Sequence, residues 1–202
     1  MKGKRPLSPQ QIWLNRLVHL LALLPLLALL WGYWQNTLGI NPIHTLTLRT
    51  GKAALVLLIL SLACTPLNLI FGWSWVFPIR RLLGLYAFFY AAIHLLIFVG
   101  LDYGFQMDLV VEAMRTNEYT QVGLVAFLIL VPLALTSTHH SIAWLGYKRW
   151  KLLHRLSYVA AILAILHYAL LVRQHYTQPI IFALILAVLF GIRLFYVWRK
   201  KN

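Results

Sequence analysis

The chain has 202 residues, of which 61% are hydrophobic and only 11% are charged, with a mean hydropathy of +0.77. A soluble domain averages about 45–50% apolar and about 25% charged residues, so this chain has too little polar sequence to cover a soluble core. The composition excludes a soluble globular, disordered or disulfide-linked protein and predicts an integral membrane protein.

The charge is strongly basic, with 18 Lys and Arg against four Asp and Glu and a net charge of +14. In a soluble protein this excess would indicate nucleic-acid binding. Here the basic residues form short clusters between long apolar runs, which is typical of cytoplasmic loops of membrane proteins. We therefore expect no nucleic-acid partner. The single cysteine, Cys64, lies inside an apolar run and is interpreted as a packed residue.

Six apolar stretches approach the length of about 20 residues that a helix needs to cross a bilayer. In chain order they cover residues 17–34, 53–71, 82–101, 119–138, 156–172 and 179–198. The fold class predicted is an all-α integral membrane protein, with one six-helix transmembrane domain over residues 1–202. The first stretch is expected to remain as a helix, because it is long and lacks a small-residue cleavage site before Asn36. The loop from Asp102 to Glu118 is expected to form a short interfacial segment.

The basic flanks predict the orientation of the six helices. One side would hold Lys2, Lys4, Arg5, Arg80, Arg81, Lys148, Arg149, Lys151, Arg155, Arg199, Lys200 and Lys201. The other side would hold Arg49, Lys52, Arg115, Arg173 and all four acids, Asp102, Asp108, Glu112 and Glu118. The more basic side is expected to be cytoplasmic, which places both termini inside. Arg80 and Arg81 are assigned this topological role, with anionic lipid or a cofactor phosphate as the alternative.

Histidine is the residue type that could carry chemistry, because glycine-rich phosphate loops, CxxC pairs and carboxylates within the spans are missing. His94 lies 13 residues after Arg81, and His167 lies 12 residues after Arg155. At 1.5 Å per residue, both imidazoles lie roughly 18–20 Å from the same membrane face. Two histidines at one depth suit six-coordinate haem b, which takes one imidazole on each side of the iron. The alternative is that each histidine only hydrogen-bonds a neighbouring helix.

A second histidine pair, His19 and His154, is predicted near the cytoplasmic ends of the first and fifth helices. The fifth helix would then serve two haems, one near each membrane face; the alternative is that both residues are solvated at the interface. The four remaining histidines, His44, His139, His140 and His175, are interpreted as solvated loop residues.

Several segments together carry a resemblance. They are Pro78–Val99 (PIRRLLGLYAFFYAAIHLLIFV), Trp150–Arg173 (WKLLHRLSYVAAILAILHYALLVR), Asn15–Pro25, Arg49–Leu67 and the TST at Thr136–Thr138. Taken in chain order, these segments extend over nearly the whole sequence, which resembles the MsrQ (formerly YedZ) family. This family comprises haem-binding membrane subunits of bacterial periplasmic methionine-sulfoxide reductase systems, within the ferric-reductase-like transmembrane superfamily.

The resemblance implies a bacterial inner-membrane protein that takes electrons from the quinone pool or from a cytosolic flavin reductase. It implies that one or two haems b pass them to MsrP, the periplasmic molybdopterin subunit that repairs oxidised methionines, and that FMN is a further cofactor. His94, His154 and His167 match haem-linked histidines of the family. His19 matches a helix-one histidine, and its role as a ligand is inferred from depth. Other superfamily members carry two histidines on helix three, so the second ligand of an inner haem stays open.

We therefore expect a haem b electron-transfer subunit of an oxidoreductase system that performs no substrate chemistry of its own. Two hypotheses from other classes compete with it. A small transporter, or a proton or metal channel, would use the same histidines and would be colourless. A structural scaffold would retain its activity when the deep histidines are replaced.

Overall fold

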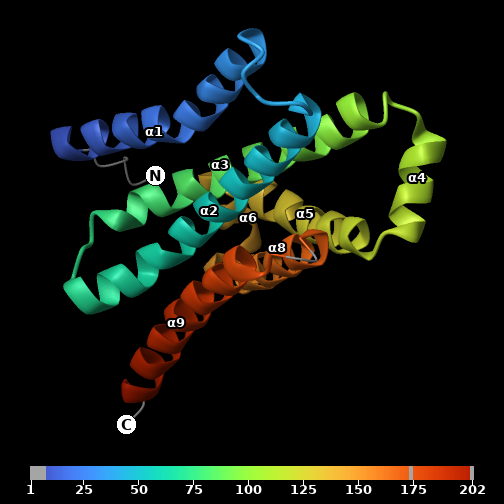
Figure 1. Cartoon of the computed structure of the whole chain (residues 1–202). Coiled ribbons are helices and arrows are strands. Elements are labelled where there is room, and N and C mark those ends of the chain that lie inside the picture. Colours follow the sequence, from blue (N-terminus) through green and yellow to red (C-terminus); the bar gives the residue numbers. More distant parts are fainter. Residues whose placement is uncertain (1–7, 173–174, 201–202) are drawn as a thin grey trace.

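The computed structural model describes residues 8–172 and 175–200, and within these ranges it contains helices and no strand (Figure 1). In chain order the helices are α1 Pro9–Trp34, α2 Pro42–Phe71, α3 Val76–Ile97, the π-helical η1 Phe98–Asp102, α4 Met107–Thr116, α5 Glu118–Leu135, α6 His139–Leu145, α7 Tyr147–Leu153, α8 Leu156–Leu171 and α9 Thr177–Arg199. Six of the resulting helical segments are long and apolar enough to cross a bilayer. The predicted all-α, six-span membrane protein is confirmed.

Several helices begin earlier than the apolar stretches predict, because capping residues lie outside those stretches. The Ser8 side chain accepts a hydrogen bond from the Gln11 N–H at 3.2 Å, and Asn41 accepts one from the His44 N–H at 3.0 Å. In both helices proline follows the cap, where its missing N–H costs nothing. As a result, α2 begins at Pro42 and not at residue 53, which brings about three further turns into the bundle.

Some predicted loop positions are helical. Helix α3 begins at Val76, so Arg80 lies in its second turn and donates to the Thr65 hydroxyl at 3.0 Å. His139 and His140 were interpreted as loop residues, and this was wrong: they open α6, which Thr138 caps by accepting from the Ser141 N–H at 3.0 Å. Predictions that concern Lys2, Lys4, Arg5, Arg173 and Lys201 lie outside the described residues.

The core forms where α2 crosses α3 and where α5 lies against α8 (Figure 1). Three alanines, Ala87, Ala160 and Ala161, are fully buried there. In membranes, small residues at helix crossings let the backbones approach closely, because packing and not hydrophobicity drives association. The four helices therefore form a compact centre, and α1 and α9 lie at its periphery.

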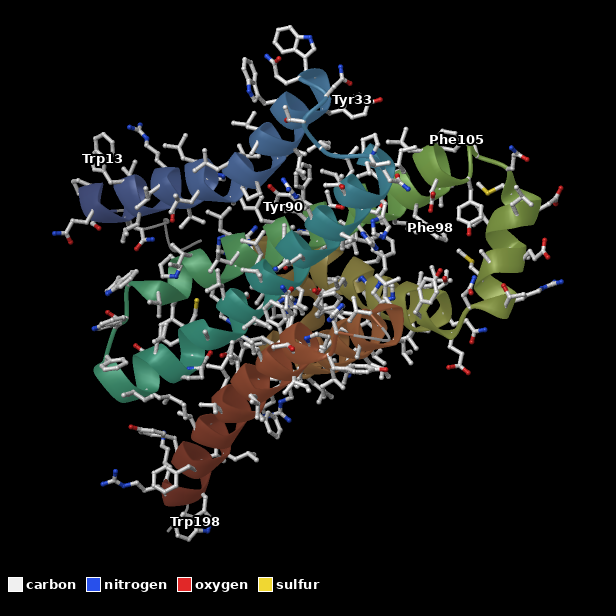
Figure 2. The ribbon with its side chains drawn as sticks, in the orientation of Figure 1. Trp13, Tyr33, Tyr90, Phe98, Phe105 and Trp198 are labelled. Atoms are coloured by element: carbon white, nitrogen blue, oxygen red, sulfur yellow. The ribbon has the colours of Figure 1, made fainter. Side chains whose placement is uncertain are left out.

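Helix α1 bends in its middle, where Tyr90 of α3 enters its hydrogen-bond ladder (Figures 1 and 2). The Tyr90 hydroxyl donates to the Ala22 carbonyl at 2.6 Å and accepts from the Leu26 N–H at 3.1 Å. In a regular helix these two backbone groups would bond each other. Pro25, which has no N–H, lies between them. The buried hydroxyl thus replaces one helical hydrogen bond and joins α1 to α3.

We expect Tyr90→Phe to destabilise the protein by about 1–3 kcal/mol, because it leaves a buried N–H and a buried carbonyl without their partner. The measurement is thermal or denaturant unfolding of the detergent-solubilised protein. Tyr33→Phe is the control, since Tyr33 lies near the C-terminal end of α1 and is exposed. Equal stability of the two variants would contradict this role of Tyr90.

The segment between α3 and α5, which was predicted to form a short interfacial segment, contains helix α4. Helix α3 passes directly into η1, and α4 then crosses to the start of α5 at one end of the bundle (Figure 1). Asp108 lies in the first turn of α4 and Arg115 in the last, which complements the helix dipole. This end of the bundle also holds Asp102 and Glu118, so all four acids of the chain gather there.

Candidate functional site

The structure brings the two deep histidines together in the centre of the bundle. His94 projects from α3 and His167 from α8, and their ring centres lie 6.0 Å apart. The ring planes are nearly perpendicular, at 84°. Both side chains are partly buried. The equal depth that the sequence predicts therefore corresponds to direct proximity.

Each of these rings is oriented by a backbone carbonyl. His94 Nδ1 lies 2.9 Å from the Thr47 oxygen of α2, and His167 Nδ1 lies 2.6 Å from the Tyr119 oxygen of α5. A carbonyl oxygen can only accept, so each Nδ1 carries the proton and donates. In a neutral imidazole the other nitrogen, Nε2, then keeps its lone pair. This is the arrangement of metal-ligating histidines, whose second ring N–H typically donates to a carbonyl or carboxylate.

A glycine provides the space for each ring. Gly51 follows Thr47 by four residues on α2, and Gly123 follows Tyr119 by four residues on α5. A Cβ added at Gly51 would lie 3.0 Å from His94 Nδ1, and one added at Gly123 would lie 2.7 Å from His167 Nδ1. Each imidazole therefore lies against bare helix backbone, one turn beyond the carbonyl that it contacts.

The same local geometry thus occurs twice, once where α3 meets α2 and once where α8 meets α5. In both cases a carbonyl and a glycine four residues later receive one imidazole. Sequence analysis missed these four residues. An isolated glycine inside an apolar helix often has a packing role, and this was the available signal at Gly51 and Gly123.

A cavity of about 280 Å³ opens between the four helices, and both histidines line it. Its walls are largely apolar: Leu55 and Leu58 from α2, Ala91 from α3, Phe127 and Leu130 from α5, and Ala164 from α8. Asn41, His44, Lys52, Asp102 and Thr120 add polar groups. An apolar cavity with a few convergent polar groups is the usual form of a cofactor site.

The second predicted pair, His19 and His154, is not brought together in the described structure. His19 is exposed on α1, and its Nδ1 lies 2.7 Å from the Tyr86 hydroxyl of α3. His154 lies between α7 and α8, and its ring packs on Trp150 with a centre distance of 4.2 Å. The two rings therefore contact different elements. Their roles as ligands of a second haem stay predictions.

The Nε2 atom of His154 is also engaged differently from that of the deep pair. It lies 3.2 Å from the Thr136 hydroxyl, which itself lies 2.6 Å from the Pro132 carbonyl. Because that hydroxyl donates to the carbonyl, it accepts from His154, whose Nε2 is then protonated. Iron ligation through Nε2 would require this hydrogen bond to break.

The remaining histidines are exposed: His44 on the first turn of α2, His139 and His140 at the start of α6, and His175 before α9. His44 differs from the interpretation in one respect, since it also lines the cavity. Among the described residues, no group of three or more His, Cys, Asp or Glu side chains could hold a bare metal ion. A histidine pair suits a metal whose other ligands come from a macrocycle.

Comparison with known proteins identifies the family. Residues 50–165 match the family described as the ferric reductase like transmembrane component. The protein-methionine-sulfoxide reductase heme-binding subunit MsrQ of Herminiimonas arsenicoxydans is 40% identical over 199 residues, which cover 98% of this chain and 91% of that protein. The chain belongs to the MsrQ family. This family membership confirms the resemblance inferred from the quoted segments.

Two further MsrQ proteins show how widely this similarity extends. MsrQ of Rhodospirillum rubrum is 43% identical over 180 residues, covering 88% of this chain and 86% of that protein. MsrQ of Deinococcus radiodurans is 43% identical over 188 residues, which cover 93% of this chain and 91% of that protein. Together with the six span-length helices, the MsrQ similarity shows a multi-pass membrane protein of ferric-reductase-like type.

Proposed function

We propose that this MsrQ-family chain holds haem b between His94 and His167 and uses it to carry electrons through the membrane. One observation carries the proposal. The two imidazoles line one apolar cavity with their ring centres 6.0 Å apart, and each has its Nδ1 within hydrogen-bonding distance of a backbone carbonyl. That leaves two Nε2 lone pairs, which is the ligand set of a six-coordinate haem.

The residues present fit this cofactor. An imidazole nitrogen lies about 2.1 Å from a bound transition metal, so two imidazoles on opposite sides of one iron have ring centres roughly 6.5 Å apart. The separation of 6.0 Å between His94 and His167 is close to this value. Gly51, Gly123, Ala91 and Ala164 line the cavity with small or absent side chains. Flat walls of this kind suit a planar macrocycle.

The protein's own groups would set the properties of the site. Haem supplies one-electron chemistry when bound, because its iron alternates between two oxidation states. The carbonyls of Thr47 and Tyr119 make the imidazoles more basic, which favours the ferric state. The apolar walls exclude water, which disfavours the charged ferric state and raises the potential. The midpoint potential would be the balance of these two effects.

The direction of electron transfer is assigned from the charged residues at the two ends of the bundle. Met114 and Tyr119, from the segment that holds all four acids, line the cavity, so the site lies nearer to that end. We assign that end to the periplasm and both termini to the cytoplasm, since Arg80, Lys151 and Arg199 lie toward the opposite end. The acceptor is then a periplasmic methionine-sulfoxide reductase subunit, MsrP.

The electron donor would act at the cytoplasmic end, and it would be the quinone pool or a cytosolic flavin reductase. A single haem near the periplasmic end leaves a long gap to this donor, and a second haem at His154 would shorten it. FMN, the other cofactor implied by the family, stays a prediction. The chain itself would perform no chemistry on methionine sulfoxide and would serve as the electron carrier of an inner-membrane system.

The test is the visible spectrum of the detergent-purified protein, oxidised and dithionite-reduced, with pyridine-haemochrome quantitation. We expect a b-type reduced α-band at one haem per chain, or at two if His154 also binds. Rapid reoxidation of the reduced protein by added MsrP would support the assigned acceptor. A colourless protein from haem-replete cells would overturn the proposal and favour the transporter or channel.

A further inference from the structure

A buried hydroxyl on the cavity wall has no hydrogen-bond partner. Thr120 lies in the first turn of α5, next to Tyr119, whose carbonyl orients His167. Its side chain is only 8% exposed, and its Oγ1 is the one buried side-chain N or O atom without a partner among the described residues. Burial of an unpaired hydroxyl is unfavourable, so the atom is suited to a polar group of a ligand.

A cation lines the same cavity. Lys52 follows Gly51, the residue that contacts the His94 ring, and its ammonium donates to the Gln178 side-chain oxygen of α9 at 2.9 Å. The Tyr168 hydroxyl donates to the same oxygen at 2.6 Å, so Gln178 is fixed from two sides. Lys52 is thus held by a neutral amide and not by a carboxylate. Two of its three ammonium protons remain available.

The other polar groups on the lining do not replace Lys52. Among the described lining residues, Lys52 is the only lysine or arginine and Asp102 is the only acid. Asp102 lies at the end of η1, is exposed, and offers no donor when ionised. Asn41 already uses its side-chain oxygen to cap α2. The donors that we assign to an anion are therefore Lys52 and Thr120.

We infer that Lys52 and Thr120 bind the two carboxylates of the cofactor, the haem propionates, at the periplasmic end of the cavity. This inference rests on the proposed haem between His94 and His167. An ammonium–carboxylate hydrogen bond is among the stronger polar contacts in proteins, and it gains strength next to an apolar wall. The carboxylate edge of the macrocycle would then face the periplasmic acceptor, which sets one orientation of the cofactor in the cavity.

The test compares haem with its dimethyl ester, which lacks both carboxylates, in reconstitution of the full-length apoprotein in detergent. We expect the natural chain to bind haem about tenfold or more tightly than the ester. The double variant Lys52→Met with Thr120→Val should bind haem and its ester equally. The single variant Lys52→Arg, which keeps a cation, should retain the preference for haem. Arg49→Met is the matched control, because Arg49 is an exposed cation of α2 that does not line the cavity.

A redox titration supplies a second readout. The ferric haem carries one more positive charge than the ferrous form, so loss of the nearby Lys52 cation should lower the midpoint potential, whereas Arg49→Met should not. A natural chain that binds haem and its ester equally, or a double variant that retains the preference, would overturn the inference while leaving the haem site intact. A natural chain that binds neither compound would overturn the proposed function together with this inference.

Discussion

His94→Ala and His167→Ala are each expected to abolish the six-coordinate haem spectrum and to weaken haem binding by at least about 100-fold. Loss of a group that merely orients a metal ligand already costs about 10–100-fold in affinity, and loss of the ligand itself costs more. In the proposed site each imidazole would be one of two protein ligands of the haem, and the two ring centres lie 6.0 Å apart. The measurement is the haem content and reduced spectrum of the purified variants.

His175→Ala and His139→Ala are the controls, because both residues are exposed and neither lines the cavity. His154→Ala separates the two possible haems: with one haem per chain it should leave the spectrum unchanged, and with two it should remove half of the haem. Full haem content in both His94→Ala and His167→Ala would refute the proposed pair.

Gly123→Ala is expected to weaken haem binding by about 10–100-fold, because it displaces the imidazole of His167. The new Cβ would lie 2.7 Å from His167 Nδ1 and 2.9 Å from its Cε1, far inside contact distance. The ring must therefore move away from the Tyr119 carbonyl that holds it at 2.6 Å. Gly51→Ala should have the same effect at His94 but a weaker one, since its Cβ would lie 3.0 Å from Nδ1.

Electron paramagnetic resonance of the ferric protein checks this displacement directly. Nearly perpendicular imidazole planes leave two iron d orbitals close in energy, which predicts a strongly anisotropic low-spin signal for the natural chain. Rotation of His167 in Gly123→Ala should shift this signal or replace it with a high-spin one. Gly191→Ala is the matched control, because a Cβ at Gly191 of α9 meets no atom within 4 Å. Equal spectra for Gly123→Ala and Gly191→Ala would contradict the role of Gly123 in positioning the His167 ring.

The membrane class, the six spans and the depth of His94 and His167 could be derived from sequence. The reason is that these properties are local. Depth depends on the rise per residue and on the basic residues that anchor each helix end, and both are visible in the chain. The family was also recognisable, because the similarity to MsrQ extends over 98% of the chain.

Other features were not visible in the hydropathy pattern. Hydropathy did not indicate that α2 begins at Pro42, because the Asn41 cap and the polar first turns lie outside the apolar stretch. For this reason Thr47 and Gly51 were not recognised as parts of the site. Likewise, similar depth at the cytoplasmic end predicted a pair of His19 and His154, yet α1 lies against α3 and directs His19 to Tyr86.

The sequence by itself thus determined where along each helix a histidine lies, and the tertiary structure decided which helix it meets. Distance along an axis follows from residue number alone. The rotation and neighbours of a helix depend on contacts between residues far apart in the chain, such as Tyr119 with His167 and Thr47 with His94. The two sites in which a carbonyl and a glycine receive an imidazole exist only because α2 packs against α3 and α5 packs against α8. That arrangement is a property of the packed bundle.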